Sequence, residues 1–278
     1  MSVNTDAVNT DAVRSGAGAA AYARTVRTES GGPGLLLAHG AGGSVEANFG
    51  AVLDELAARF SVVGVDYPGA GATPRAEAPL LLDELADQLV AAADAEGLQR
   101  FAVLGYSLGG NVAVRVATRY PDRVTALVLT ATFARADNRL ELAGDLWKAL
   151  ADRGEPDLAA SLLVPLVLNP AVLEGLSAQE VRQLVRDTAR TLPPGQADHA
   201  ALIRGADLRA EIAALDVPAL VVVTTQDLLV PAGLQRELAH ILPGARLAEL
   251  PTGHLPFAER PAEWAALVTA FLSEPAAG

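Results

Sequence analysis

Ser107 lies at the centre of a Gly-Tyr-Ser-Leu-Gly motif over residues 105–109. The apolar run before it, residues 101–104, predicts a buried strand, and residues 111–117 after it have the pattern of a helix. A serine on so tight a strand-to-helix turn is pushed out of the sheet, with its hydroxyl at the mouth of the helix. The two glycines let the helix and neighbouring strands approach where a Cβ would clash. The motif therefore predicts a serine nucleophile at the end of a strand.

A serine hydroxyl needs a base within hydrogen-bond reach, and the base needs a third group to orient it. Of the four histidines, His254 lies in the loop after the last expected strand. In a parallel sheet this loop emerges at the same carboxyl edge as Ser107, where such sheets bind ligands. His39 directly follows another strand, whereas His199 and His240 lie in helical patterns, where we expect ordinary surface positions. We therefore predict that His254 is the base.

The orienting carboxylate should lie at the same edge of the sheet. Asp227 closely follows the expected strand at residues 220–224, whereas Asp216 precedes this strand and belongs to the opposite edge. The expected strand at residues 124–129 is followed by Thr-Ala-Thr and no acid. Asp66 ends a strand at the correct edge, but we expect it to structure the glycine-containing turn that follows. Asp227 is therefore the predicted acid, and the order serine, aspartate, histidine is that of one known hydrolase fold.

The composition restricts the class of protein. A chain of 278 residues can form one large domain, or a core domain with a sizeable insertion. It is 51% hydrophobic and 19% charged, as in a globular protein, and no apolar run approaches the roughly 18 residues of a membrane span. The net charge of −12 argues against nucleic acid or an anionic membrane surface as a partner.

The chain contains no cysteine, which excludes disulfides, thiolate nucleophiles and cysteine-ligated metals. No His/Asp cluster has metal-ligand spacing, and Gly40-Ala41-Gly42-Gly43 lacks the spacing of a dinucleotide loop. We therefore expect neither a metal nor a cofactor. The lack of cysteine fits a reducing compartment, and the first residues have no secretory signal, so we expect a cytoplasmic protein.

Strand and helix patterns alternate along most of the chain, which predicts an α/β fold with a mainly parallel sheet and helices on both faces. The expected strands are nearly all apolar, as in a sheet covered on both faces. We expect strands at residues 22–27, 35–38, 61–66, 101–104, 124–129, 220–224 and 245–249, and helices at 46–59, 80–95, 231–241 and 261–272.

Two parts of the chain depart from this alternation. Residues 1–21 contain a duplicated Val-Asn-Thr-Asp-Ala followed by small residues, and we expect a disordered tail. Residues 134–205 show helical patterns only, including a capping box at Ser177 and Glu180. We therefore expect a helical insertion, or cap, at 134–205, between the two parts of an α/β core at 22–133 and 206–278.

These pieces together resemble the α/β-hydrolase superfamily, in its branch with a serine nucleophile and a helical cap. The resemblance covers nearly the whole chain after about residue 22. It rests on His39-Gly40, the turn at residues 66–73, the serine motif, Asp227 with Val230-Pro231, and Gly253-His254 with Glu259-Arg260-Pro261. It implies an α/β-hydrolase fold with a mostly parallel eight-stranded sheet, and an oxyanion hole formed by the backbone N–H groups of Ala41 and Leu108.

The chain departs from the family pattern at two places. The turn usually written with serine after its second glycine has Ala72-Thr73 here. Hydrolases of carbon–carbon bonds in the superfamily usually carry a tryptophan after the histidine, where this chain has Leu255. Dehalogenases and epoxide hydrolases of this fold use an aspartate nucleophile, which Ser107 does not provide. We therefore discount these branches.

The expected activity is acyl transfer to water, with an ester, lactone or thioester as substrate. The apolar cap predicts a small-molecule substrate with an apolar portion, and Tyr106 and Phe133 are candidates to line its pocket. Trp147 and Trp264 lie in helical patterns and are expected to be packing residues. Three alternatives stay open: an acyltransferase or cyclase, a lyase or cofactor-free oxygenase, and a ligand-binding receptor with a vestigial site.

Overall fold

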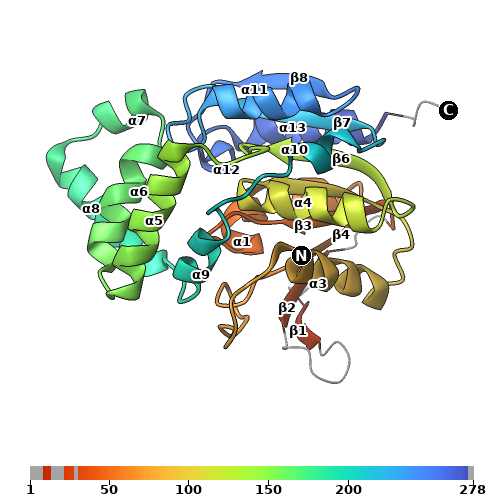
Figure 1. The fold of residues 1–278 in the computed structure, drawn as a ribbon, viewed down its shortest axis with the longest axis horizontal. Coiled ribbons are helices and arrows are strands. Elements are labelled where there is room, and N and C mark those ends of the chain that lie inside the picture. Colours follow the sequence, from red (N-terminus) through yellow and green to blue (C-terminus); the bar gives the residue numbers. More distant parts are fainter. Residues whose placement is uncertain (1–8, 14–21, 28–30, 275–278) are drawn as a thin grey trace, which may run out of the picture.

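The computed structural model describes residues 9–13, 22–27 and 31–274. They contain one eight-stranded sheet with helices around it (Figure 1). The strand order is β1-β2-β4-β3-β5-β6-β7-β8. β2 pairs antiparallel with both β1 and β4, and every other neighbouring pair is parallel. The strands are β1 (Asn9–Val13), β2 (Tyr22–Arg27), β3 (Gly34–Ala38), β4 (Ser61–Val65), β5 (Phe101–Tyr106), β6 (Val124–Thr130), β7 (Ala219–Thr224) and β8 (Arg246–Leu250). The α/β-hydrolase fold and all seven strands located in the sequence are confirmed.

The eighth strand falls inside the expected disordered tail. Asn9–Val13 form β1, with Asn9 opposite Val26 and Val13 opposite Tyr22, so the expectation for residues 1–21 was wrong at this segment. Without β1, β2 would leave the N–H and C=O groups of one edge unpaired, and β1 satisfies them. The remainder of the expected tail, residues 1–8 and 14–21, lies outside the described residues.

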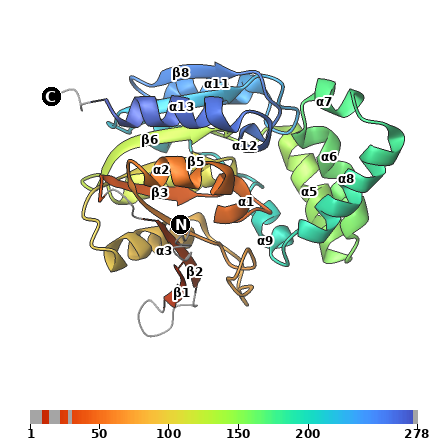
Figure 2. The same ribbon diagram turned by 180° about the vertical axis from the view of Figure 1, so that it is seen from behind.

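Helices cover both faces of the sheet, and two apolar cores result. One face is covered by α3 (Leu82–Ala95), α4 (Leu108–Arg119), α10 (Arg209–Ala213) and α11 (Ala232–Ile241), and the other by α1 (Val45–Phe49), α2 (Leu53–Ala57) and α13 (Pro261–Leu272) (Figures 1 and 2). Because side chains alternate along a strand, Leu36 and Val63 enter the first core, whereas Leu35 and Val62 enter the second. The helix expected over residues 46–59 is interrupted by a 3₁₀ turn at Gly50–Val52.

Between β6 and β7 the chain forms a group of helices at one end of the sheet (Figures 1 and 2). Residues 134–205, called the helical segment below, contain α5 (Asn138–Asp152), α6 (Pro156–Val167), α7 (Pro170–Glu174), α8 (Ala178–Thr191) and α9 (Gln196–Ala201). The capping box is present at the start of α8, where Ser177 and Glu180 each accept a hydrogen bond from the other's backbone N–H. None of the described helices has both the length and the apolar character needed to cross a bilayer.

Candidate functional site

Ser107 occupies the turn between β5 and α4 in a strained conformation, with φ 52° and ψ −122°. A positive φ at a residue other than glycine costs energy, and here backbone hydrogen bonds hold the turn closed. The Ser107 N–H donates to the Thr130 carbonyl at 3.0 Å, and the Gly110 N–H donates to the Ser107 carbonyl at 2.8 Å. A Cβ at Gly109 would overlap the Ala38 carbonyl, which explains the glycine two residues after the serine.

His254 links Ser107 to Asp227, as predicted from the strand ends. The distance from Ser107 Oγ to His254 Nε2 is 2.9 Å, and that from His254 Nδ1 to Asp227 Oδ2 is 2.7 Å. An ionised carboxylate only accepts hydrogen bonds, so Nδ1 carries the proton and Nε2 is free to accept from the serine hydroxyl. All three residues are buried. The arrangement can remove the hydroxyl proton as the oxygen attacks an electrophile.

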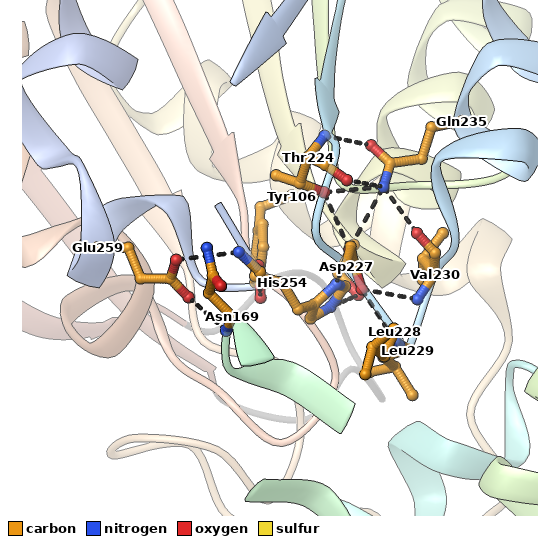
Figure 3. Close-up of polar contacts among 12 residues, drawn as sticks. Tyr106, Asn169, Thr224, Asp227, Leu228, Leu229, Val230, Gln235, His254 and Glu259 are labelled. Atoms are coloured by element: carbon orange, nitrogen blue, oxygen red, sulfur yellow. Dashed lines mark hydrogen bonds and ion pairs between the residues drawn. The ribbon is translucent and has the colours of Figure 1, made fainter. Parts of the chain in front are cut away.

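The Asp227 carboxylate is saturated with hydrogen bonds (Figure 3). Its Oδ1 accepts from the backbone N–H groups of Leu229 and Val230, each at 2.9 Å. Its Oδ2 accepts from Thr224 Oγ1 at 2.9 Å and from Gln235 Nε2 at 3.3 Å, in addition to His254. The side chain of Gln235 also bonds the Thr224 N–H and the Val230 carbonyl, so it braces the loop that carries the acid. These donors compensate for burial of the negative charge.

The loop that carries His254 is attached to the helical segment (Figure 3). The His254 N–H donates to the Val167 carbonyl at 2.7 Å. The carboxylate of Glu259, at the end of α12 (Pro256–Glu259), accepts from the N–H groups of Gly253 and Asn169, at 3.0 and 3.1 Å. The position of the imidazole therefore depends on a contact between the core and the helical segment.

The loop after β3, residues 40–43, lies beside Ser107. Its residues 41–43 and Ser107 line one cavity, which is described below. Three of its four N–H groups have acceptors, and these bonds are Gly40 N–H to Asn48 Oδ1 (2.9 Å), Gly42 N–H to His199 Nδ1 (3.1 Å) and Gly43 N–H to the Gly40 carbonyl (3.2 Å). Within the part of the chain that the structure describes, the N–H groups of Ala41 and Leu108 have no acceptor. Ala41 and Leu108 both line the cavity, so these two donors are available to a bound molecule.

His199 is not at the surface, so the expectation for this histidine was wrong. It is 0% exposed, whereas His240 is exposed as expected. The His199 Nε2–H donates to the Pro68 carbonyl at 3.0 Å, and Nδ1 accepts from Gly42. Burial lowers the pKa of His199, so its imidazole is neutral at pH 7. No residue pattern around His199 signals this contact, because it forms only when α9 packs against the core.

His39 is a second buried, neutral histidine in this region. Its Nδ1–H donates to the Gly40 carbonyl at 2.8 Å, and its Nε2 accepts from the Tyr67 N–H at 3.0 Å. Burial, with a smaller contribution from His199, lowers the pKa of His39 to about 3. Asp66, the third acid considered in the sequence, accepts from the Val45 N–H and lies against the turn that follows it, as expected. Burial raises the pKa of Asp66.

The cavity over Ser107 has a volume of about 280 Å³ and is lined both by core loops and by the helical segment. Tyr106 and Phe133 both line it, and so does Trp147 of α5. The Tyr106 hydroxyl is engaged, since it donates to the His254 carbonyl at 2.9 Å. None of the described Asp, Glu, Lys or Arg side chains lines this cavity. The described residues also contain no group of three or more His, Cys, Asp or Glu side chains placed to hold a metal ion.

Comparison with known proteins places the chain in a family. A family model described as the alpha/beta hydrolase fold matches residues 33–261, so the chain belongs to this family. Together with its relatives, which are named hydrolases and esterases, this match identifies the protein as an enzyme of the hydrolase class.

Three relatives illustrate the range of the family. The chain is 31% identical to the pyrrolizixenacetamide deacetylase of Xenorhabdus hominickii, over 87% of this chain and 91% of the relative. It is also 31% identical to the pimeloyl-(acyl-carrier protein) methyl ester esterase of Nitrosomonas europaea, over 86% of this chain and 95% of the relative. The crystal structure of the enol-lactonase from Burkholderia xenovorans superposes with a TM-score of 0.82 at 26% identity, covering 92% of this chain and 97% of that chain.

Proposed function

We propose that the protein is a serine hydrolase that cleaves an ester, lactone or thioester through an acyl-serine intermediate. The observation that carries this proposal is the continuous hydrogen-bonded path from Ser107 Oγ through His254 to Asp227, with distances of 2.9 and 2.7 Å. The names of the relatives support it, because a deacetylase, a methyl ester esterase and an enol-lactonase all act on acyl groups.

In the first half of the reaction, Ser107 Oγ attacks the carbonyl carbon of the substrate while its proton passes to His254 Nε2. Asp227 holds the imidazole in the tautomer that accepts this proton and stabilises the resulting imidazolium. The carbonyl oxygen becomes an oxyanion, and the N–H groups of Ala41 and Leu108 donate to it. Collapse of this intermediate breaks the bond to the leaving group, which takes the proton from His254 and leaves an acyl-serine.

In the second half, His254 removes a proton from a water molecule, and the hydroxide formed attacks the acyl-serine carbonyl. The same two N–H groups receive the second oxyanion. Its collapse breaks the bond to Ser107 Oγ, which regains its proton from His254, and the carboxylic acid is released. The cycle consumes one water and requires no cofactor.

The cavity favours an uncharged acyl portion. A charged group bound there would lose its hydration with no opposite charge among the described lining side chains. Apolar side chains such as Phe133 and Leu163 line much of the wall, and the helical segment closes part of the cavity. We therefore assign residues 134–205 as a cap over the site.

The decisive test is covalent labelling with a fluorophosphonate probe followed by mass mapping, compared with a Ser107→Ala variant. We expect the label on Ser107 alone, and a fall in kcat of about 10⁴–10⁶-fold in the variant, as for removal of a triad serine. Labelling elsewhere, or unchanged ester turnover by the variant, would contradict the proposal. Product analysis with an added alcohol or amine separates hydrolysis from acyl transfer to another acceptor.

A pair of matched substrates tests the uncharged acyl portion. We expect the p-nitrophenyl ester of hexanoic acid to have a higher kcat/KM than the p-nitrophenyl monoester of adipic acid, which carries a terminal carboxylate. A carboxylate that enters the cavity without a hydrogen-bond partner costs about 1–3 kcal/mol even when its desolvation is partial. This cost corresponds to a ratio of the two kcat/KM values of roughly 5 to 150. Equal kcat/KM values would mean that the acyl chain does not enter this cavity.

A further inference from the structure

A histidine outside the proposed triad joins the helical segment to the loop beside Ser107. We propose that His199 is a positioning residue for catalysis, which fixes the loop at residues 40–43 from the helical segment so that the Ala41 N–H points at the developing oxyanion. This inference rests on the proposed acyl-serine chemistry. It assigns a function to the buried contact between α9 and the core, which the triad does not use.

The start of α9 is fixed on the core, so His199 stands on a rigid support. The Gly195 N–H donates to the Gly69 carbonyl at 2.9 Å, and the two backbones lie so close that neither glycine leaves space for a side chain. Arg75 binds Asp198 through two hydrogen bonds, at 2.6 and 3.0 Å. These contacts, with the bond from His199 Nε2 to the Pro68 carbonyl, leave Nδ1 facing the Gly42 N–H.

Gly42 is held from two sides by the helical segment. Its N–H is bound by His199, and the ring of Trp147 packs so closely that a Cβ at Gly42 would lie 2.7 Å from it. Trp147 is itself fixed, since its Nε1–H donates to Gln196 Oε1 at 2.8 Å at the start of α9. The Gly42 N–H therefore cannot turn into the cavity without breaking the contact with α9.

These contacts set the direction of the Ala41 N–H. A trans peptide is planar, with its N–H and C=O pointing in opposite directions. The Gly40 carbonyl accepts from His39 Nδ1 and the Gly43 N–H, which fixes the peptide that contains the Ala41 N–H. The next peptide, with the Gly42 N–H, is fixed by His199. With both planes fixed, Ala41 has no freedom to rotate its N–H away from the cavity.

The test compares two substitutions of nearly equal size, His199→Asn and His199→Leu. The Asn Oδ1 can replace Nδ1 as the acceptor for the Gly42 N–H, whereas Leu cannot. His199→Leu leaves the Gly42 N–H and the Pro68 carbonyl without their present partner, whereas His199→Asn can still pair the first of them. If His199 acts as an acceptor, His199→Leu has the lower kcat at a temperature where circular dichroism shows both variants to be fully folded. If His199 only packs, the two folded variants have equal kcat values.

We expect kcat for p-nitrophenyl hexanoate to fall about 10²-fold in His199→Leu with KM little changed, at the lower end of the cost of losing an oxyanion donor. The inhibition constant of phenylboronic acid, whose serine adduct is tetrahedral, should rise by a similar factor. His199→Asn should retain kcat within about tenfold of the wild type. His240→Leu and His240→Asn are the matched controls, because His240 is at an exposed position of α11. They should change neither kcat nor the inhibition constant of phenylboronic acid.

A kcat of His199→Leu within threefold of the wild type, or a kcat of His199→Asn below that of His199→Leu, would overturn the inference. The proposed function fails in a different way, through unchanged turnover in Ser107→Ala. Loss of turnover in Ser107→Ala with full turnover in His199→Leu would remove this inference and leave the acyl-serine mechanism in place.

Discussion

The loops on the two sides of Ser107 satisfy their polar groups in different ways. On the acid–base side, after β7 and β8, Asp227 accepts hydrogen bonds from five donors, supplied by Thr224, Leu229, Val230, Gln235 and His254. On the oxyanion side, after β3, the glycine N–H groups are all bound and the N–H of Ala41 is left without an acceptor among the described residues.

This difference corresponds to the charges that the proposed reaction requires. The negative charge of Asp227 is permanent, so the folded protein must supply its donors in advance. The charge on the oxyanion exists only during the reaction, so its donors must be rigid but unoccupied beforehand. The helical segment contributes to both sides, through Val167 and Asn169 on the acid–base side and through His199 on the oxyanion side.

The largest expected effect breaks the acid–base side. In Asp227→Asn, the two backbone donors at Oδ1 require the amide oxygen there, which places the NH₂ group against His254 Nδ1. The imidazole must then carry its proton on Nε2, where it cannot accept from Ser107. We expect kcat to fall about 10⁴-fold, as when the wrong tautomer is enforced in a triad. Steady-state kinetics on p-nitrophenyl hexanoate would measure the fall.

Asp216→Asn is the matched control, because Asp216 is exposed and precedes β7 at the opposite edge of the sheet. Its kcat should equal that of the wild type. Retained activity in Asp227→Asn would mean that another carboxylate orients His254, and the contrast between the two sides would lose its basis.

A smaller effect is expected from breaking the oxyanion side at Gly42. This residue has φ 69°, and a Cβ there would lie 2.7 Å from the Trp147 ring. Gly42→Ala must therefore displace the loop or the ring, and we expect kcat to fall by about 10²-fold, as for the loss of one oxyanion donor. Gly154→Ala separates steric overlap from backbone strain, since Gly154 also has φ 69° but nothing lies within 4 Å of its added Cβ. An equal loss of activity in both variants would contradict the role of the loop.

The sequence indicated that Ser107, Asp227 and His254 lie together, but it did not indicate the contacts that hold the loop after β3. Ser107, Asp227 and His254 follow strands of a parallel sheet, and strand ends meet at one edge whatever the side chains around them. Those strands are marked by apolar runs such as residues 101–104 and 220–224, which the structure reproduces in β5 and β7. The positions of these three residues were therefore visible from local patterns alone.

The contacts of His199 and Gln235 were not visible in this way. His199 reaches Gly42 across 157 residues of chain, and its burial depends on how α9 packs against the loop at Pro68 and Gly69. β1 was missed for a related reason. Asn9, Asp11 and Ala12 are weak strand formers, and residues 9–13 become a strand through backbone pairing with β2. A local pattern predicts an element, whereas these features arise from tertiary contacts.

The smallest expected effect is on stability, and it sharpens the comparison because it acts on the oxyanion side alone. His39 has a pKa of about 3 in the folded protein against an ordinary value of 6.5. Between these values the unfolded chain binds a proton that the folded protein does not, so the free energy of unfolding falls as the pH falls from about 6.5 towards 3. Protonation would also set a second N–H of His39 against the Tyr67 N–H and break the bond that it accepts.

From pH 7.5 to pH 5, the contribution of His39 to the free energy of unfolding should fall by about 2 kcal/mol. This is because pH 5 lies about 1.5 units below 6.5 and each unit corresponds to about 1.4 kcal/mol for one proton. Chemical denaturation at both pH values should therefore show a smaller acid-induced loss in His39→Gln than in the wild type. Asp66 acts in the opposite direction, because its raised pKa makes the folded protein take up the proton first, but it is present in both proteins and cancels in the difference. His240→Gln, at an exposed site, is the control. Equal losses in the wild type and His39→Gln would mean that the oxyanion side tolerates a charged imidazole, and that rigidity there does not depend on neutral histidines.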